Sequence, residues 1–160
     1  MKPWAKLLLS TLFAFVAVPQ VLPAQSISDP LLGTWTLNVA KSTYKNLAAP
    51  RSETRTYDTT AEGMDHLTIH RVAADGTTTT EETTFKTDGK PYAFSGNPAL
   101  DSLEATRVND RSGHGNLMLQ GKRVGRYTLA VSKDGKQLTD TLTLQISGKT
   151  AHAVRVFDRQ

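Results

Sequence analysis

The amino-acid sequence predicts an all-β protein: an antiparallel up-and-down β-barrel of about eight to ten strands that follows an N-terminal export signal. Two patterns predict the barrel. After residue 30, apolar and polar residues alternate with the period of two that marks a strand with one buried face. Asp-Gly pairs, which favour tight turns, recur at 75–76, 88–89 and 134–135, as expected of consecutive hairpins. No segment beyond the signal carries helical periodicity.

The predicted strands lie at 32–39, 52–59, 64–73, 77–86, 90–95, 103–109, 115–120, 123–132, 137–146 and 151–158. Residues 40–51 form the longest early connection, which has room for one helical turn before Pro50. Short hairpins join all the later strands, so a flat meander would expose its edges unless it closed on itself. A closed barrel is therefore the leading prediction, and a β-sandwich is the alternative.

The hairpin near the C-terminus shows the alternation most clearly. Leu138, Leu142 and Leu144 share one face of its second strand, and threonines occupy the other face. In the first strand, Tyr127 and Leu129 likewise alternate with polar residues. One face of this hairpin is therefore expected to be buried and the other to be exposed to solvent.

The first 24 residues are typical of a cleavable secretory signal. Lys2 and Lys6 precede the apolar stretch 7–18, and Ala24 supplies a small residue before a cleavage point at Gln25. A membrane anchor is the alternative. However, a helix of that stretch spans about 18 Å, well short of the ~30 Å hydrocarbon core of a bilayer.

This signal predicts two segments, a signal peptide at 1–24 and a barrel domain at 25–160, and a periplasmic or extracellular location. The chain has no cysteine, which excludes a lipid-modified N-terminus and disulfide bracing. The expected product is a soluble domain that is not integral to a membrane. The oligomeric state stays open.

Composition argues against two classes of partner. The formal charge of +4 falls by two when the signal is removed, and the longest basic run is Lys122-Arg123, so a nucleic-acid partner is not expected. An outer-membrane barrel would need an apolar, lipid-facing band on alternate positions. The threonine-rich strand 77–86 has no such band on either face.

The sequence predicts no catalytic residue, no metal site and no cofactor. His66 and His70 have a spacing that could bind one metal on a helix, but on a strand they stand about 13 Å apart. Glu81 and Glu82 are adjacent in a strand, so they point to opposite faces and cannot form an acid–base pair. The chain contains neither a Gly-x-Ser-x-Gly elbow nor a glycine-rich phosphate loop.

Asp140 is the one polar residue that interrupts an apolar face, between Leu138 and Leu142. Burial of an unpaired carboxylate costs several kcal/mol. Asp140 is therefore expected either to be exposed to solvent at the barrel mouth or to act as a polar anchor in a ligand cavity. Its candidate cationic partners are Arg107, Arg123, Arg126 and Arg155.

A Gly-x-Trp motif at Gly33 and Trp35, followed by Lys41-Ser42, opens the first predicted strand. Together with the segments 88–92, 96–98 and 132–136, it resembles the secreted lipocalin-like (calycin-type) proteins of bacteria, over residues 30–158. The resemblance implies a barrel in which the indole plugs one end, often beneath an arginine from a late strand. It implies a fold and a compartment but no mechanism.

The leading functional hypothesis is therefore an exported module that binds or carries a small apolar or amphipathic ligand. Its candidate ligand-binding residues are Trp35, Tyr92, Tyr127, Asp140 and Arg126, although a packing role is favoured for Trp35 over ligand contact. The alternative is an interaction or structural protein of the cell envelope with a filled barrel, and an enzyme is a third hypothesis. Cavity size separates the first two: a void of a few hundred Å³ with a polar group such as Asp140 favours ligand binding.

Overall fold

Eleven strands and one short 3-10 helix make up residues 29–160, the part of the chain that the computed structural model describes. The predicted signal at 1–24 and the domain start at residue 25 lie outside the described residues. The elements are β1 (Gly33–Leu37), η1 (Val39–Lys41), β2 (Thr43–Lys45), β3 (Ser52–Thr59), β4 (Asp65–Val72), β5 (Thr78–Phe85), β6 (Asp88–Ser95), β7 (Ser102–Asn109), β8 (Ser112–Leu119), β9 (Lys122–Val131), β10 (Gln137–Ile146) and β11 (Lys149–Arg159).

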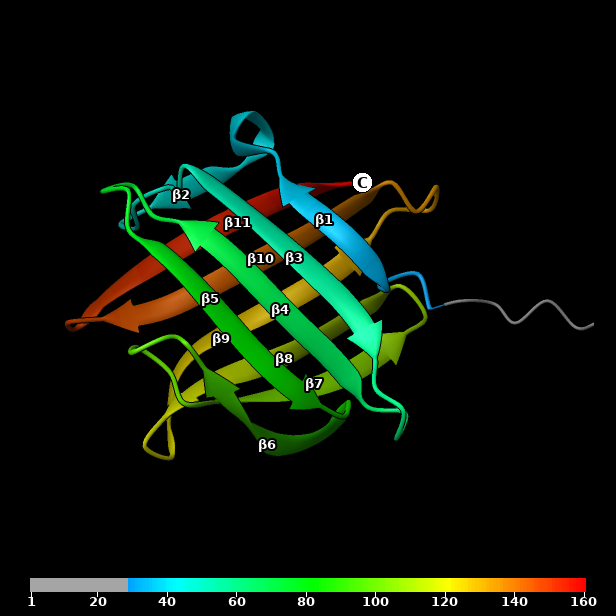
Figure 1. Ribbon diagram of the computed structural model, residues 1–160. Helices are drawn as coiled ribbons and strands as arrows, with labels where there is room; N and C mark the ends of the chain where they lie inside the picture. Colours follow the sequence, from blue (N-terminus) through cyan, green and yellow to red (C-terminus); the bar gives the residue numbers. More distant parts are fainter. Residues whose placement is uncertain (1–28) are drawn as a thin grey trace, which may run out of the picture.

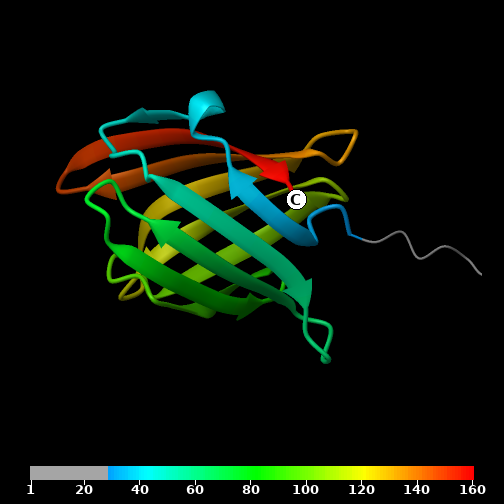
Figure 2. The same cartoon turned by 45° about the horizontal axis from the view of Figure 1, so that its top comes forward.

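The strands close into an antiparallel barrel of ten strands, in which each strand from β3 to β11 pairs with the next (Figures 1 and 2). The ring is completed by β1, which pairs with β3 on one side and with β11 on the other. The closing register sets Trp35 opposite Arg159 and Leu37 opposite Phe157. Closure confirms the predicted barrel and rules out the sandwich, because a sandwich would leave the first and last strands unpaired.

The strand β2 was not predicted. It pairs with β11 through Tyr44 and Ala153, further along the edge that β1 occupies (Figure 1). The 3-10 helix η1 separates β1 from β2 and is capped by Asn38, whose side-chain oxygen accepts from the Lys41 backbone N–H at 3.1 Å. The helical turn expected within 40–51 is thus present one residue earlier, and most of the remaining connection leads into or out of β2.

The Asp88-Gly89 pair does not form the turn that the sequence predicted. Both residues belong to β6, where the register with β7 shifts between Asp88 and Pro91. Gly89 has a φ of 76° in this bulge. A bulge with a left-handed glycine uses the same backbone conformation as many tight turns, so the dipeptide alone does not separate the two.

The indole of Trp35 fills one end of the barrel. It is fully buried, and its Nε1 donates to the Leu31 carbonyl at 2.8 Å. The Arg159 guanidinium stacks on the indole ring at 4.1 Å and donates to the carbonyls of Leu32, at 2.7 Å, and Gly135, at 2.6 Å. A late-strand arginine therefore covers the tryptophan, as the family resemblance implies.

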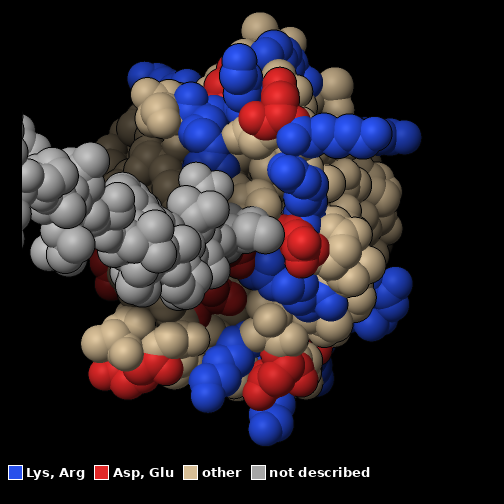
Figure 3. Space-filling model, turned by 90° about the vertical axis from the view of Figure 1, so that its right-hand side faces the viewer, with Lys and Arg blue, Asp and Glu red and all other residues tan. Residues whose placement is uncertain are grey.

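The chain enters β1 at the end of the barrel that faces the viewer in Figure 3, where basic and acidic side chains are intermixed. We call this end the tryptophan end, and the opposite end, with the turns 73–77, 120–121 and 147–148, the far end. Among residues 29–160, no helix has the length and apolar character needed to cross a membrane.

Candidate functional site

The barrel encloses a cavity of about 410 Å³, and every strand except β1 contributes to its wall. This volume lies within the range of roughly 300–1,000 Å³ that is usual for small-molecule sites. Most of the lining surface is apolar, with leucine side chains from five different strands: Leu67, Leu103, Leu117, Leu129 and Leu142. The barrel interior therefore contains a cavity with a mostly apolar wall, beside a packed core around Trp35 and Phe157.

Small residues in the wall keep this space open. A Cβ atom on Gly115 would lie 2.5 Å from the Tyr127 hydroxyl, and one on Gly125 would lie 2.6 Å from a methyl carbon of Leu144. The two glycines therefore let larger neighbours lie flat against the wall instead of projecting across the barrel. Leu129 faces inward and still keeps part of its surface exposed, because it borders the void.

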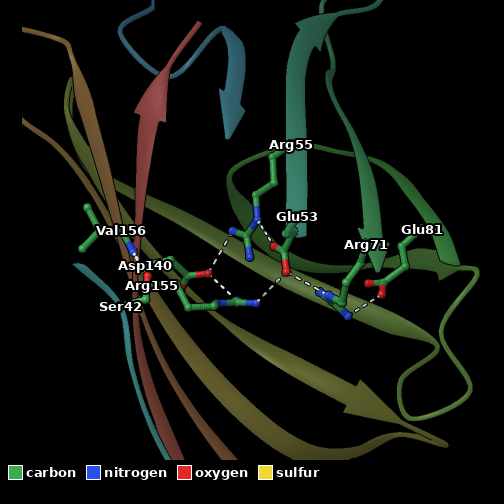
Figure 4. A network of polar contacts seen from close by, with 8 residues as sticks. All are labelled: Ser42, Glu53, Arg55, Arg71, Glu81, Asp140, Arg155 and Val156. Carbon is green, nitrogen blue, oxygen red and sulfur yellow. Dashed lines mark hydrogen bonds and ion pairs between the residues drawn. The ribbon is translucent and has the colours of Figure 1, made fainter. Parts of the chain in front are cut away.

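Six charged side chains form a connected network inside the barrel, which we call the charged cluster (Figure 4). Its members are Glu53 and Arg55 on β3, Arg71 on β4, Glu81 on β5, Asp140 on β10 and Arg155 on β11, and all six line the cavity. Glu53 and Asp140 are each 1% exposed.

Arg55 joins the two most deeply buried acids. Its Nε donates to Glu53 Oε1 at 2.7 Å, and its Nη1 lies 2.8 Å from Asp140 Oδ2. The same Asp140 oxygen accepts from Nη2 of Arg155. Two guanidinium groups thus share one carboxylate oxygen of Asp140.

Arg71 extends the cluster towards the far end. Its Nε donates to Glu53 Oε2 at 2.8 Å, and its Nη1 donates to Glu81 Oε1 at 2.6 Å. Arg155 Nη1 lies 3.6 Å from the same Glu53 oxygen. Glu53 is therefore contacted by three arginines, Arg55, Arg71 and Arg155, and every acid of the cluster has at least one cationic partner.

These contacts fix the protonation state of Glu53. Burial by itself would raise the pKa of this carboxyl, but Arg55, Arg155 and Arg71 together hold the pKa well below its usual range. For Arg55, burial would lower the pKa, and the neighbouring Glu53 and Asp140 instead raise the pKa. Both groups are therefore charged at neutral pH.

Three buried polar atoms on the cavity wall have no hydrogen-bond partner within residues 29–160. They are the hydroxyl of Tyr44, Oδ1 of Asp140 and Nε of Arg155. Buried polar groups normally have partners, so three orphans in one cavity are an unusual feature. They mark the part of the wall where a ligand can add hydrogen bonds.

Of the five residues predicted to contact ligand, Tyr127 and Asp140 line the cavity. The Tyr127 hydroxyl donates to the Glu104 carbonyl at 3.1 Å, so the residue offers its ring to the void. Trp35 belongs to the packed end of the barrel and is not part of the lining. Tyr92 donates to Asp88 at 3.1 Å and also lies outside the lining.

Arg126 is exposed on the outer face of β9, because it alternates with the inward-facing Tyr127. The structure therefore does not bring it to Asp140. The partners of Asp140 are Arg155, which was among the candidates, and Arg55, which was not. The expectation that Asp140 is solvated at the barrel mouth is wrong. The residue is buried, and its register position opposite Arg155 lies in mid-strand.

Sequence reasoning missed four members of the cluster: Glu53, Arg55, Arg71 and Glu81. Glu53, Arg55 and Tyr57 alternate with threonines in β3, and charged residues at such positions normally face solvent. The recoverable signal was the pairing of opposite charges two residues apart on the same face as Tyr57. Glu82 is exposed and Glu81 is buried, which confirms that these two acids face opposite sides.

The two histidines of β4 both face the outside of the barrel. Nδ1 of His66 lies 3.0 Å from Asp58, and Nδ1 of His70 lies 3.0 Å from the Thr80 hydroxyl. Their outward orientation confirms the strand assignment. Within the described residues, no three metal-ligating side chains gather around one point.

No protein-family model matches the chain, and no curated protein matches it in sequence. Among solved structures, it is similar to wild-type fluorescent protein UnaG and to two mutants of that protein. Wild-type UnaG is 17% identical over 81% of this chain and 97% of its own, with a TM-score of 0.54. The mutants are 17% identical over 82% of this chain and 96% of theirs, with TM-scores of 0.53 and 0.54. The similarity concerns the fold alone: residues 29–160 share a closed antiparallel β-barrel with UnaG.

Proposed function

We propose that the protein is an exported binding module that holds a small apolar or amphipathic molecule inside its barrel. The observation that carries this proposal is the cavity of about 410 Å³, whose surface is mostly apolar and whose wall also holds the charged cluster. A filled barrel, the alternative expected of a purely structural envelope protein, would have no such space. The calycin-like fold supports the same proposal.

The lowered pKa of Glu53 favours binding over catalysis at this carboxylate. A general base needs a carboxylate whose pKa lies near the working pH. The arginines around Glu53 lower its pKa instead, so it is a poor proton acceptor at neutral pH. Glu53 therefore has the character of a fixed polar group of the lining and not of a general base.

Native mass spectrometry tests the binding proposal. The full chain is expressed with its own N-terminus, purified from the exported fraction and sprayed under non-denaturing conditions. We expect a second mass peak at one small molecule per chain, which disappears on denaturation. A clean apo mass, combined with no thermal shift against a panel of lipids and apolar metabolites, would contradict the proposal.

Export is tested separately by the N-terminal sequence of the mature protein. The signal pattern predicts that the exported chain begins at or near Gln25. A chain recovered only from the cytoplasm with Met1 intact would refute the location without affecting the binding site.

A further inference from the structure

We propose that the ligand carries an uncharged group that both donates and accepts hydrogen bonds, such as a carboxamide, and not an ionised head group. This inference rests on the proposed function and specifies its ligand class. Two independent features of the cavity support it: the balance of charge in the lining, and the chemistry of the three unpartnered atoms.

The charges that line the cavity cancel. The charged cluster contains three arginines and three acids, and the complete lining contains five of each: Arg55, Arg71, Arg107, Arg111 and Arg155 against Glu53, Asp65, Glu81, Asp110 and Asp140. An ion that entered this space would meet no net charge of the opposite sign. It would lose its hydration without a net attraction from the lining to offset that cost.

Each arginine of the charged cluster is also already paired with at least one acid. Within the described residues, the Nε–H of Arg155 is free. A full ion pair between an anion and Arg55 or Arg155 would nevertheless compete with Asp140 and Glu53, which are almost completely buried. A buried carboxylate without its partner is strongly destabilising. A cation would likewise have to draw an acid away from its arginine.

The unpartnered atoms lie on three neighbouring strands. Asp140 and Arg155 are register partners on β10 and β11, and Tyr44 on β2 is the register partner of Ala153, two residues before Arg155. Side chains two residues apart on a strand share a face. The register therefore places all three groups on one part of the wall.

Their hydrogen-bonding capacities are complementary to a neutral polar group. Oδ1 of Asp140 can only accept, the Nε–H of Arg155 can only donate, and the Tyr44 hydroxyl can do either. A carboxamide presents a donor and an acceptor from one planar unit. It can satisfy both sides without breaking any ion pair of the charged cluster.

Three ligands of equal chain length test the proposal: a straight-chain primary amide, the corresponding carboxylate and the corresponding alkylammonium. Their dissociation constants for the full mature protein are measured at neutral pH by isothermal titration calorimetry, below the concentration at which each forms micelles. We expect the amide to bind at least about tenfold more tightly than either ion, because only the ions must be desolvated without a free counter-charge.

A matched pair of variants isolates the role of charge balance. Glu81→Gln removes one negative charge from the cluster at constant size and leaves Tyr44, Asp140 and Arg155 in place. It is expected to reduce the preference for amide over carboxylate by about tenfold. Glu82→Gln makes the same change on the outer face and should leave the preference unchanged. Thermal melting of both variants checks that they fold.

The outcomes are distinguishable. If the carboxylate or the ammonium binds most tightly, the neutral-ligand inference is wrong while the binding function stands. If none of the three ligands binds and no other apolar compound shifts the melting temperature, the proposed function fails and the inference fails with it. If Glu81→Gln does not fold, the order of affinities of the unmodified protein still decides.

Discussion

Arg55 on β3 is held between Glu53, at 2.7 Å, and Asp140, at 2.8 Å, and so connects two strands that do not pair with each other. Its guanidinium also lies 4.5 Å from the centre of the Phe157 ring. The arginine thus bridges the polar lining of the cavity and the apolar core of the tryptophan end. Removal of its charge leaves two buried carboxylates short of a partner.

Arg55→Gln is therefore expected to lower the free energy of unfolding by about 3–5 kcal/mol, the range found when one member of a buried ion pair is removed. Urea denaturation of the purified chain measures this change. Arg126→Gln, on the exposed face of β9, is the matched control and should change stability by less than about 0.5 kcal/mol. Equal effects of the two substitutions would show that the cluster does not stabilise the fold.

Acid should weaken the fold through Glu53. Because the pKa of Glu53 is lower in the folded chain than its ordinary value of 4.5, the unfolded chain binds more protons as the pH falls below that value. The stabilisation from Glu53 is present above pH 4.5 and is lost progressively towards lower pH. Urea midpoints measured from pH 7 down to pH 3 should fall, and a midpoint that stays constant would contradict this assignment.

Trp35→Ala should lower the free energy of unfolding by about 3–5 kcal/mol, as expected for truncation of a fully buried tryptophan. The substitution also removes the ring on which Arg159 stacks. Since Trp35 does not line the cavity, the variant should retain ligand affinity at a temperature where it is folded. An unchanged melting temperature would show that Trp35 is not a packing residue.

The strands of the barrel and the tryptophan end were largely predictable from the sequence, because the patterns that specify them lie within short segments of the chain. The alternation of apolar residues located all ten barrel strands. The family resemblance that the Gly-x-Trp motif carries implied that Trp35 plugs one end of the barrel. Only β2 was missed, since three residues that pair along part of one neighbour leave no periodic signal. The prediction of a tight turn at 88–89 was wrong because a glycine with a positive φ can form either a turn or a bulge.

The cavity was less predictable because it depends on contacts between distant strands. Asp140 was singled out by its position on an apolar face, but its partner Arg55 lies far away in sequence, on a strand that looks amphipathic. The void depends on how Tyr127 and Leu144 pack over the glycines of β8 and β9. Such packing is a property of the closed barrel and not of any single segment.

Leu129→Trp shows whether the ligand binds inside the barrel. Leu129 borders the void, so the larger ring should occupy part of the cavity at a cost of about 1–3 kcal/mol in stability. The measurement is the affinity of an environment-sensitive apolar dye for the unmodified chain, for Leu129→Trp and for the surface control Arg126→Trp. One dye per chain is expected, with affinity reduced at least about tenfold in Leu129→Trp alone. Equal dye affinity in all three proteins would contradict an interior site.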